Sequence, residues 1–127
     1  MKHQYSFLNN GPSKDNAWWL VILEKAMAKL NVNYANLDAG LPAEAFRTLT
    51  NCPTETHKAE DLAVDQLWEI IKNAEKNNYP MVGSSGYNPM NNVASGHAET
   101  LVGGVELKKA DGSKLRLVKM RNPWGTY

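Results

Sequence analysis

The hydrophobic pattern changes its period part-way along the chain, and this change is the strongest constraint on the fold. Up to about residue 78, apolar residues recur at the i, i+3, i+4, i+7 spacing of amphipathic helices. From residue 79 the texture becomes strand-like, except in residues 84–95, which are rich in Gly, Asn, Ser and Pro and are expected to form a loop. This order predicts an α+β fold, with helices in residues 15–78 and an antiparallel sheet or half-barrel in residues 79–127.

Three helices are expected in the first part. The first carries an apolar stripe over residues 17–30, with Asp15 or Asn16 as its N-cap. A short second helix starts after Pro42, and a third covers about residues 64–76. The stripes include three tryptophans, which we expect in the core or at an interface: Trp18, Trp19 and Trp68.

The second part is dominated by a predicted hairpin. Two strand-like runs, residues 98–108 and 114–121, flank Ala110-Asp111-Gly112, which is a strong turn signal. Gly103-Gly104 within the first run indicates a bulge or a close approach of another backbone. Residues 80–83 are expected to add a short strand.

Size, charge and cysteine content exclude several classes of protein. A chain of 127 residues and 14.1 kDa is the size of a single domain, 1–127, and it can bury a core without disulfides. A net charge of +1 lacks the basic excess of nucleic-acid or anionic-membrane partners. Cys52 is the only cysteine, which excludes an internal disulfide framework and fits a reducing compartment.

The longest apolar run, residues 17–23, is too short to span a bilayer, and residues 1–10 do not resemble a signal peptide. We therefore expect a soluble intracellular, cytoplasmic domain. The chemistry-rich end over residues 121–127 stops abruptly, so we expect the sequence to be part of a longer polypeptide.

One pair of residues has the chemistry of a catalytic site. His97 lies at the entry to the first hairpin strand and Asn122 at the exit of the second, so the hairpin brings both to one end of the ribbon. Their offset along the ribbon is two to four positions, up to about 13 Å, and a bulge would remove one position. A histidine oriented by an asparagine amide is the base half of a cysteine-protease site. From spacing alone, a strand-edge histidine and a turn-forming asparagine remain the alternative.

The local sequences resemble one family. Gly96-His97-Ala98 and Arg121-Asn122-Pro123-Trp124-Gly125 are similar to the two active-site strands of the calpain family of papain-like cysteine proteases. The helix over residues 19–30 and the segments at 38–40, 44–50 and 67–68 fit the same family. The resemblance covers about residues 18–125, and the three motifs occur in order at sensible spacing.

The resemblance implies the second, His- and Asn-bearing half of a protease core. His97 would be the general base and thiolate partner, and Asn122 would orient it. Trp124 would cover their contact or lie with Gly96 at the substrate cleft between subdomains, although a core tryptophan is the alternative. The preceding Cys-bearing subdomain of the same polypeptide would supply the nucleophile, and protein chains would be the substrates. Cys52 lacks the family's Cys-Trp motif, so we expect a small, partly buried residue there and no peptidase activity from this chain alone.

Two features qualify the implied activity. The family usually has an aromatic residue two positions after the histidine, whereas this chain has Glu99, which could compete with Asn122 for His97. The resemblance also implies calcium for the full-length enzyme, but no D-x-D-x-D-G loop is present and we assign no metal ligands here. A non-catalytic calpain-like interaction or regulatory domain is therefore the second hypothesis, and an unrelated α+β binding domain is the third.

Overall fold

The computed structural model describes residues 14–87 and 93–124 of the chain. Contacts divide the chain into two compact units, Met1–Thr50 and Asn51–Tyr127, and each is described by itself. In the described ranges, no helix has the length and apolar character needed to cross a bilayer.

The first unit contains helix α1 (Trp19–Leu30), a 3-10 turn (Tyr34–Leu37) and helix α2 (Pro42–Thr50). Val21 and Ala28 lie on the buried face of α1, as the helical stripe predicts. The predicted N-cap is wrong, because Trp18 takes this position without a side-chain cap hydrogen bond. Asn16 instead has a φ of 60°, whereas a capping residue normally has extended backbone. Trp18 and Trp19 are exposed and are not core residues.

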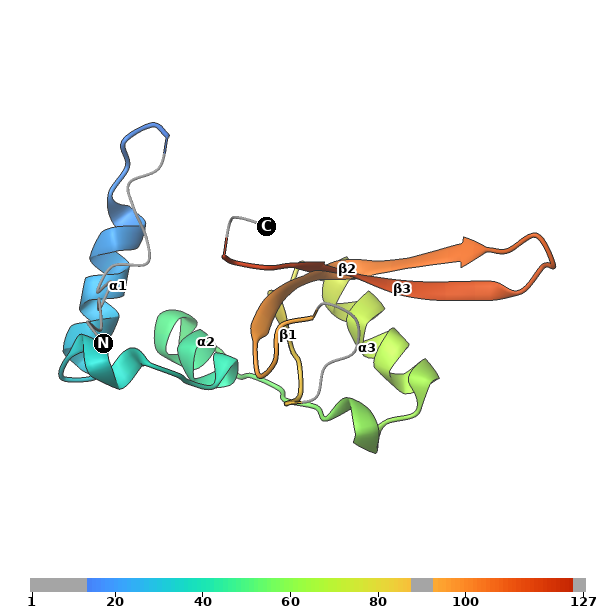
Figure 1. Ribbon diagram of the computed structural model, residues 1–127, viewed down its shortest axis with the longest axis horizontal. Helices are drawn as coiled ribbons and strands as arrows, with labels where there is room; N and C mark the ends of the chain where they lie inside the picture. The colour runs from blue at the N-terminus through green and yellow to red at the C-terminus, as the bar shows by residue number, and fades with distance from the viewer. Residues whose placement is uncertain (1–13, 88–92, 125–127) are drawn as a thin grey trace, which may run out of the picture. The chain divides into compact units, whose positions relative to one another are not determined.

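The second unit begins with a 3-10 turn (Ala59–Asp61) and helix α3 (Val64–Lys76), followed by three strands. Strands β1 (Met81–Ser84), β2 (Ala98–Lys108) and β3 (Lys114–Arg121) form an antiparallel sheet in the order β1-β2-β3 (Figure 1). Helices thus precede an antiparallel sheet, which confirms the α+β prediction. The bounds of α3, β2 and β3 are those expected from the sequence.

Helix α3 packs on β2 where the strand has no side chains. Trp68 and Ile71 of α3 are the buried core of this unit. A Cβ atom at Gly104 would lie 2.8 Å from the Trp68 ring, so only glycine allows the helix to approach this closely. The Lys72 ammonium donates a hydrogen bond to the Gly104 carbonyl at 3.1 Å and reinforces the same contact.

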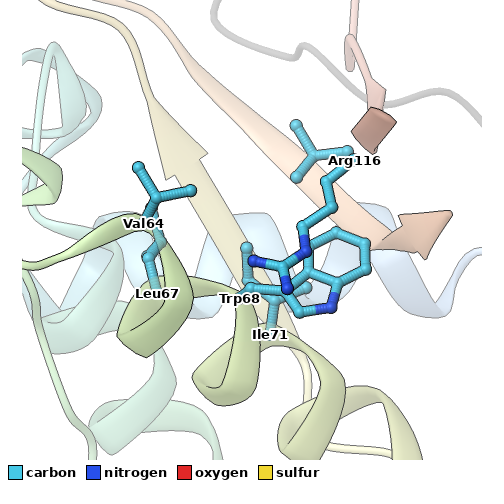
Figure 2. A pocket seen from close by; sticks show the side chains of 6 residues that line it. Val64, Leu67, Trp68, Ile71 and Arg116 are labelled. Atoms are coloured by element: carbon cyan, nitrogen blue, oxygen red, sulfur yellow. The ribbon is translucent and has the colours of Figure 1, made fainter. Parts of the chain in front are cut away.

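Arg116 of β3 lies over the ring of Trp68. Its guanidinium lies 5.2 Å from the centroid of the Trp68 ring, in the range of a cation–π interaction. Figure 2 shows the Arg116 side chain extending over Trp68, beside a shallow apolar pocket that is also lined by Val64, Leu67, Ile71 and Val118. The pocket belongs to the packing of α3 on the sheet.

The β2–β3 hairpin extends beyond the short strand β1 (Figure 1). Local hydrogen bonds hold its tip. Asp111 accepts hydrogen bonds from the backbone N–H and the hydroxyl of Ser113, at 2.9 and 2.6 Å. Gly112 has a φ of 83°, a conformation that favours glycine. Along the strands, the register shifts between Leu101 and Gly103, so Val102 is the extra residue of a β-bulge.

Candidate active site

The sheet brings His97 and Asn122 into direct contact. The outermost pair of the β2–β3 ladder is Thr100 with Arg121, so Asn122 immediately follows the paired part of β3. His97 immediately precedes β2 at the same end. The His97 Nε2 atom lies 3.0 Å from Oδ1 of Asn122, and both side chains are half-buried.

The hydrogen bonds at Asn122 determine which His97 nitrogen carries the proton. Its Oδ1 atom also accepts the backbone N–H of Trp124 at 3.1 Å. Because a backbone N–H can only donate, the carbonyl side of the amide must face this pair. Nε2 of His97 is then the donor to Oδ1, and Nδ1 is left available to a second group.

The indole ring of Trp124 lies against the imidazole. The two ring centroids are 4.5 Å apart and the ring planes are inclined by 40°. Trp124 is 59% exposed, so it is not a core residue, and the alternative reading of a core tryptophan is wrong. Trp124 therefore covers one side of His97 while its own backbone is bonded to Asn122.

The backbone on the other side of His97 is fixed by residues next to β1. Ser85 donates its N–H to the His97 carbonyl at 2.9 Å, and its hydroxyl oxygen accepts the His97 N–H at 3.0 Å. Gly96 donates its N–H to Gly86 at 3.1 Å and has a φ of 56°, which explains the glycine before the histidine. The backbone of His97 is thus held by segments on either side of the loop between β1 and β2.

Glu99 is half-buried and pairs with Gly83 of β1 across the ladder. Within the described ranges, the structure gives Glu99 no hydrogen bond or ion pair with His97. Oδ1 of Asn122 is the polar atom that meets Nε2. The competition considered from the sequence is therefore not the arrangement that the structure shows.

The carboxylates of Glu106 on the hairpin and of Glu75 on α3 have lowered pKa values. A hydrogen bond from Lys114 lowers the pKa of Glu106, and Arg116 acts in the same direction. Hydrogen bonding from Lys72 likewise lowers the pKa of Glu75. These carboxylates stabilise the scaffold and are not part of the His97–Asn122 contact.

Cys52 lies just after the end of α2 and is exposed, so the expectation of a partly buried residue is wrong. It follows the end of a helix and does not start one. Across residues 14–87 and 93–124, no group of three or more His, Cys, Asp or Glu side chains could hold a metal ion. The described residues therefore provide no cluster of three carboxylates for a calcium ion.

Sequence reasoning missed Ser85, the residue bonded to both main-chain polar atoms of His97. It lies in a stretch recognised only as a loop, and no motif distinguishes it from its neighbour Ser84. Its partnership with His97 depends on how the ladder between β1 and β2 ends, which residue types alone do not reveal.

Comparison with known proteins identifies the class. The sequence matches the family model described as calpain family cysteine protease over residues 1–127, so the chain belongs to the calpain family. It is 30% identical to the calpain-1 catalytic subunit of Mus musculus over 120 residues, which is 89% of this chain and 17% of that protein.

Further relatives are similar to the same extent. Human calpain-14 is 34% identical over 114 residues, covering 87% of this chain and 16% of that protein. The calpain-type cysteine protease ADL1 of rice is 32% identical over 122 residues, covering 87% of this chain and 5% of that protein. The chain thus spans less than a fifth of the length of these relatives.

Proposed function

We propose that this chain is the base-bearing part of a calpain-like cysteine endopeptidase, in which His97 is the general base and Asn122 orients it. The observation that carries the proposal is the 3.0 Å contact between Nε2 of His97 and Oδ1 of Asn122. With Nε2 engaged, Nδ1 is the nitrogen that faces a thiol in the assembled protease. The preceding Cys-bearing subdomain of the same polypeptide is the proposed source of that thiol.

The proposed reaction has two halves. Nδ1 of His97 takes the thiol proton, the thiolate attacks the peptide carbonyl carbon, and the C–N bond breaks as His97 returns the proton to the leaving amine. Water then loses a proton to His97 and attacks the thioester, which releases the acid and restores the thiol. Throughout, Asn122 holds the ring and stabilises the imidazolium.

Trp124 and Gly96 have supporting roles in this proposal. Trp124 packs on the imidazole, and its exposed remainder is available to line a substrate cleft or meet the Cys-bearing subdomain. Gly96 sets the backbone turn that delivers His97 to the end of β2. The substrates are protein chains, and nucleic acid is not a partner, in keeping with the net charge of +1.

An intracellular location and calcium dependence of the full-length enzyme complete the proposal. The single cysteine is typical of a reducing compartment. The part of the chain that the structure describes offers no cluster of three or more carboxylates for calcium. Any calcium requirement is therefore assigned to the rest of the polypeptide, and no step above passes through the metal.

The experiment is peptide hydrolysis by the parent polypeptide and by two single variants. His97→Ala should lower kcat by roughly 100-fold or more, because general-base catalysis is lost. His57→Ala is the matched control. It should retain activity, because the polar contact of the His57 imidazole is with Glu55, at 3.3 Å, and the proposed reaction does not use it. Full activity of His97→Ala would refute the proposed role and favour a non-catalytic interaction domain.

The 127-residue chain provides a second test. It should not turn over a peptide substrate, with or without calcium, because the proposed nucleophile belongs to another part of the polypeptide. Turnover by this chain that Cys52→Ser abolishes would overturn the assignment.

A further inference from the structure

We propose that Ser85 is a positioning residue that sets the placement of His97 through the backbone of the histidine. The proposal deepens the function proposed above and rests on it for its kinetic readout. The hydrogen bonds of Ser85 described here go to main-chain atoms of His97 and Ala94, and the proposed reaction gives Ser85 no contact with the substrate. It acts on the main chain from which the imidazole projects.

The ladder between β1 and β2 ends in an unusual last rung. Its outermost pair is Ser84 with Ala98, so the next pair outward is Ser85 with His97. In a regular antiparallel ladder, such a pair exchanges two backbone N–H to C=O bonds. Here one bond is regular, because the Ser85 N–H donates to the His97 carbonyl at 2.9 Å.

The second bond of this rung goes to a side chain. The His97 N–H donates at 3.0 Å to the hydroxyl oxygen of Ser85, which takes the place of the Ser85 carbonyl. The hydroxyl proton has an acceptor of its own, since it is donated to the Ala94 carbonyl at 2.5 Å. The hydroxyl therefore links the N–H of His97 to the returning end of the loop.

These bonds leave the His97 backbone little freedom. Both of its main-chain polar atoms are bonded to Ser85, and the preceding residue, Gly96, is bonded to Gly86 at 3.1 Å. The imidazole is then held at its tip by Asn122. Fixing both ends of the side chain defines the position of Nδ1, and small displacements of a catalytic group are costly in rate.

Replacement of Ser85 by alanine removes the acceptor of the His97 N–H and the donor to Ala94 at once. Unpaired polar groups in a partly buried site favour a rearranged backbone. Threonine keeps the hydroxyl and should preserve both bonds. Ser84 is an exposed neighbour whose side chain is given no hydrogen bond in the described structure, so Ser84→Ala is the matched control.

The test uses the parent polypeptide in four forms: wild type, Ser85→Ala, Ser85→Thr and Ser84→Ala. Kinetics are measured on a peptide substrate and corrected for the folded fraction from a thermal melt. Ser85→Ala should lower kcat roughly tenfold and leave KM within about twofold, while Ser85→Thr and Ser84→Ala stay near wild type. Equal kcat values for Ser85→Ala and Ser84→Ala, per folded molecule, would overturn the proposal.

A second readout separates this proposal from the proposed function. The imidazole 15N signals of His97 are recorded on histidine-labelled protein and assigned with His97→Gln. Ser85→Ala should shift them and Ser84→Ala should not, whether or not the protein hydrolyses peptides. Unchanged His97 signals in Ser85→Ala would refute the positioning role even if His97 is catalytic. Shifted signals in a protein whose His97→Ala variant keeps full activity would refute only the proposed function.

Discussion

The indole of Trp124 packs on the imidazole of His97 with 4.5 Å between ring centroids, while the backbone N–H of the same tryptophan is bonded to Asn122. One residue thus supports the site by both its side chain and its main chain. The three residues form a closed set in which each contacts the other two.

The first prediction concerns the ring contact. If the proposed function holds, Trp124→Ala should lower kcat/KM of the parent polypeptide roughly two- to tenfold, which is the range expected when an aromatic pair is lost. Trp124→Phe keeps a ring against His97 and should retain most of the activity. Peptide hydrolysis measures both variants, and equal losses in the two would show that the ring contact is not what matters.

The second prediction concerns the acceptor at position 122. Asn122→Ala removes the oxygen that accepts hydrogen bonds from Nε2 of His97 and from the backbone N–H of Trp124. We therefore expect kcat to fall roughly 10- to 100-fold. Asn122→Asp keeps an acceptor oxygen at this position and should lose less. If aspartate is as inactive as alanine in the same hydrolysis assay, orientation through an oxygen acceptor is not the role of this residue.

The third prediction concerns Glu99. Glu99→Gln removes the negative charge but preserves the size of a side chain that makes no hydrogen bond or ion pair with His97 in the described structure. We expect kcat/KM to stay within about twofold of wild type, since no direct interaction with His97, the proposed base, is lost. A large change in either direction would show that this carboxylate acts on the site.

The fourth prediction concerns the glycines of β2. Gly104→Ala places a methyl group 2.8 Å from the buried Trp68 ring and should reduce the free energy of unfolding by roughly 1–3 kcal/mol. Gly103→Ala meets the carboxylate end of Glu75, which can move aside, so it should cost less. Urea denaturation compares the two, and the reverse order would contradict the packing described for α3.

The fifth prediction concerns acid stability. The pKa of Glu106 is lowered in the fold by Lys114 and Arg116, from an ordinary value of 4.5. Its contribution to stability is therefore complete above about pH 4.5 and is lost as the pH falls through the lowered pKa. Urea denaturation between pH 7 and pH 3 should show a weaker acid dependence for Glu106→Gln than for wild type.

Glu60→Gln is the control for acid stability, because the structure gives Glu60 no ion pair within the described residues. Its acid dependence should follow that of wild type. An identical slope for Glu106→Gln and wild type would mean that the ion pairs at Glu106 do not persist in solution.

Much of the fold follows from periodicity. The apolar spacing of α3 and the Asp-Gly turn between β2 and β3 predict these three elements with correct bounds, because each signal is local. The start of α1 is not predicted, because Asn16 takes a positive φ and the helix begins only after Trp18. Capping propensity cannot reveal such a backbone choice.

The candidate site can be predicted only in part from the sequence. Hairpin topology places His97 and Asn122 at one end, yet their contact depends on the exact position of the bulge, which the glycine pair indicates only approximately. The role of Ser85 depends on a hydroxyl replacing a carbonyl at the end of a ladder. Neither residue type nor spacing indicates that a hydroxyl oxygen, and not a backbone carbonyl, accepts the His97 N–H.

The bulge at Val102 adds one residue to β2 between the hairpin tip and the site. The geometry of the site therefore depends on whether the number of residues in that part of β2 is odd or even. From the hairpin tip, eight steps lead along β2 from Lys108 to Thr100, but seven lead along β3 from Lys114 to its partner Arg121. Side chains alternate between the two faces of a sheet, so an unbulged ladder with the same residues would turn the start of β2 over relative to β3. His97 and Asn122 would then lie on opposite faces, although neither residue had changed. A one-residue insertion or deletion within either strand is therefore as serious for the contact between His97 and Asn122 as the loss of one of these two residues.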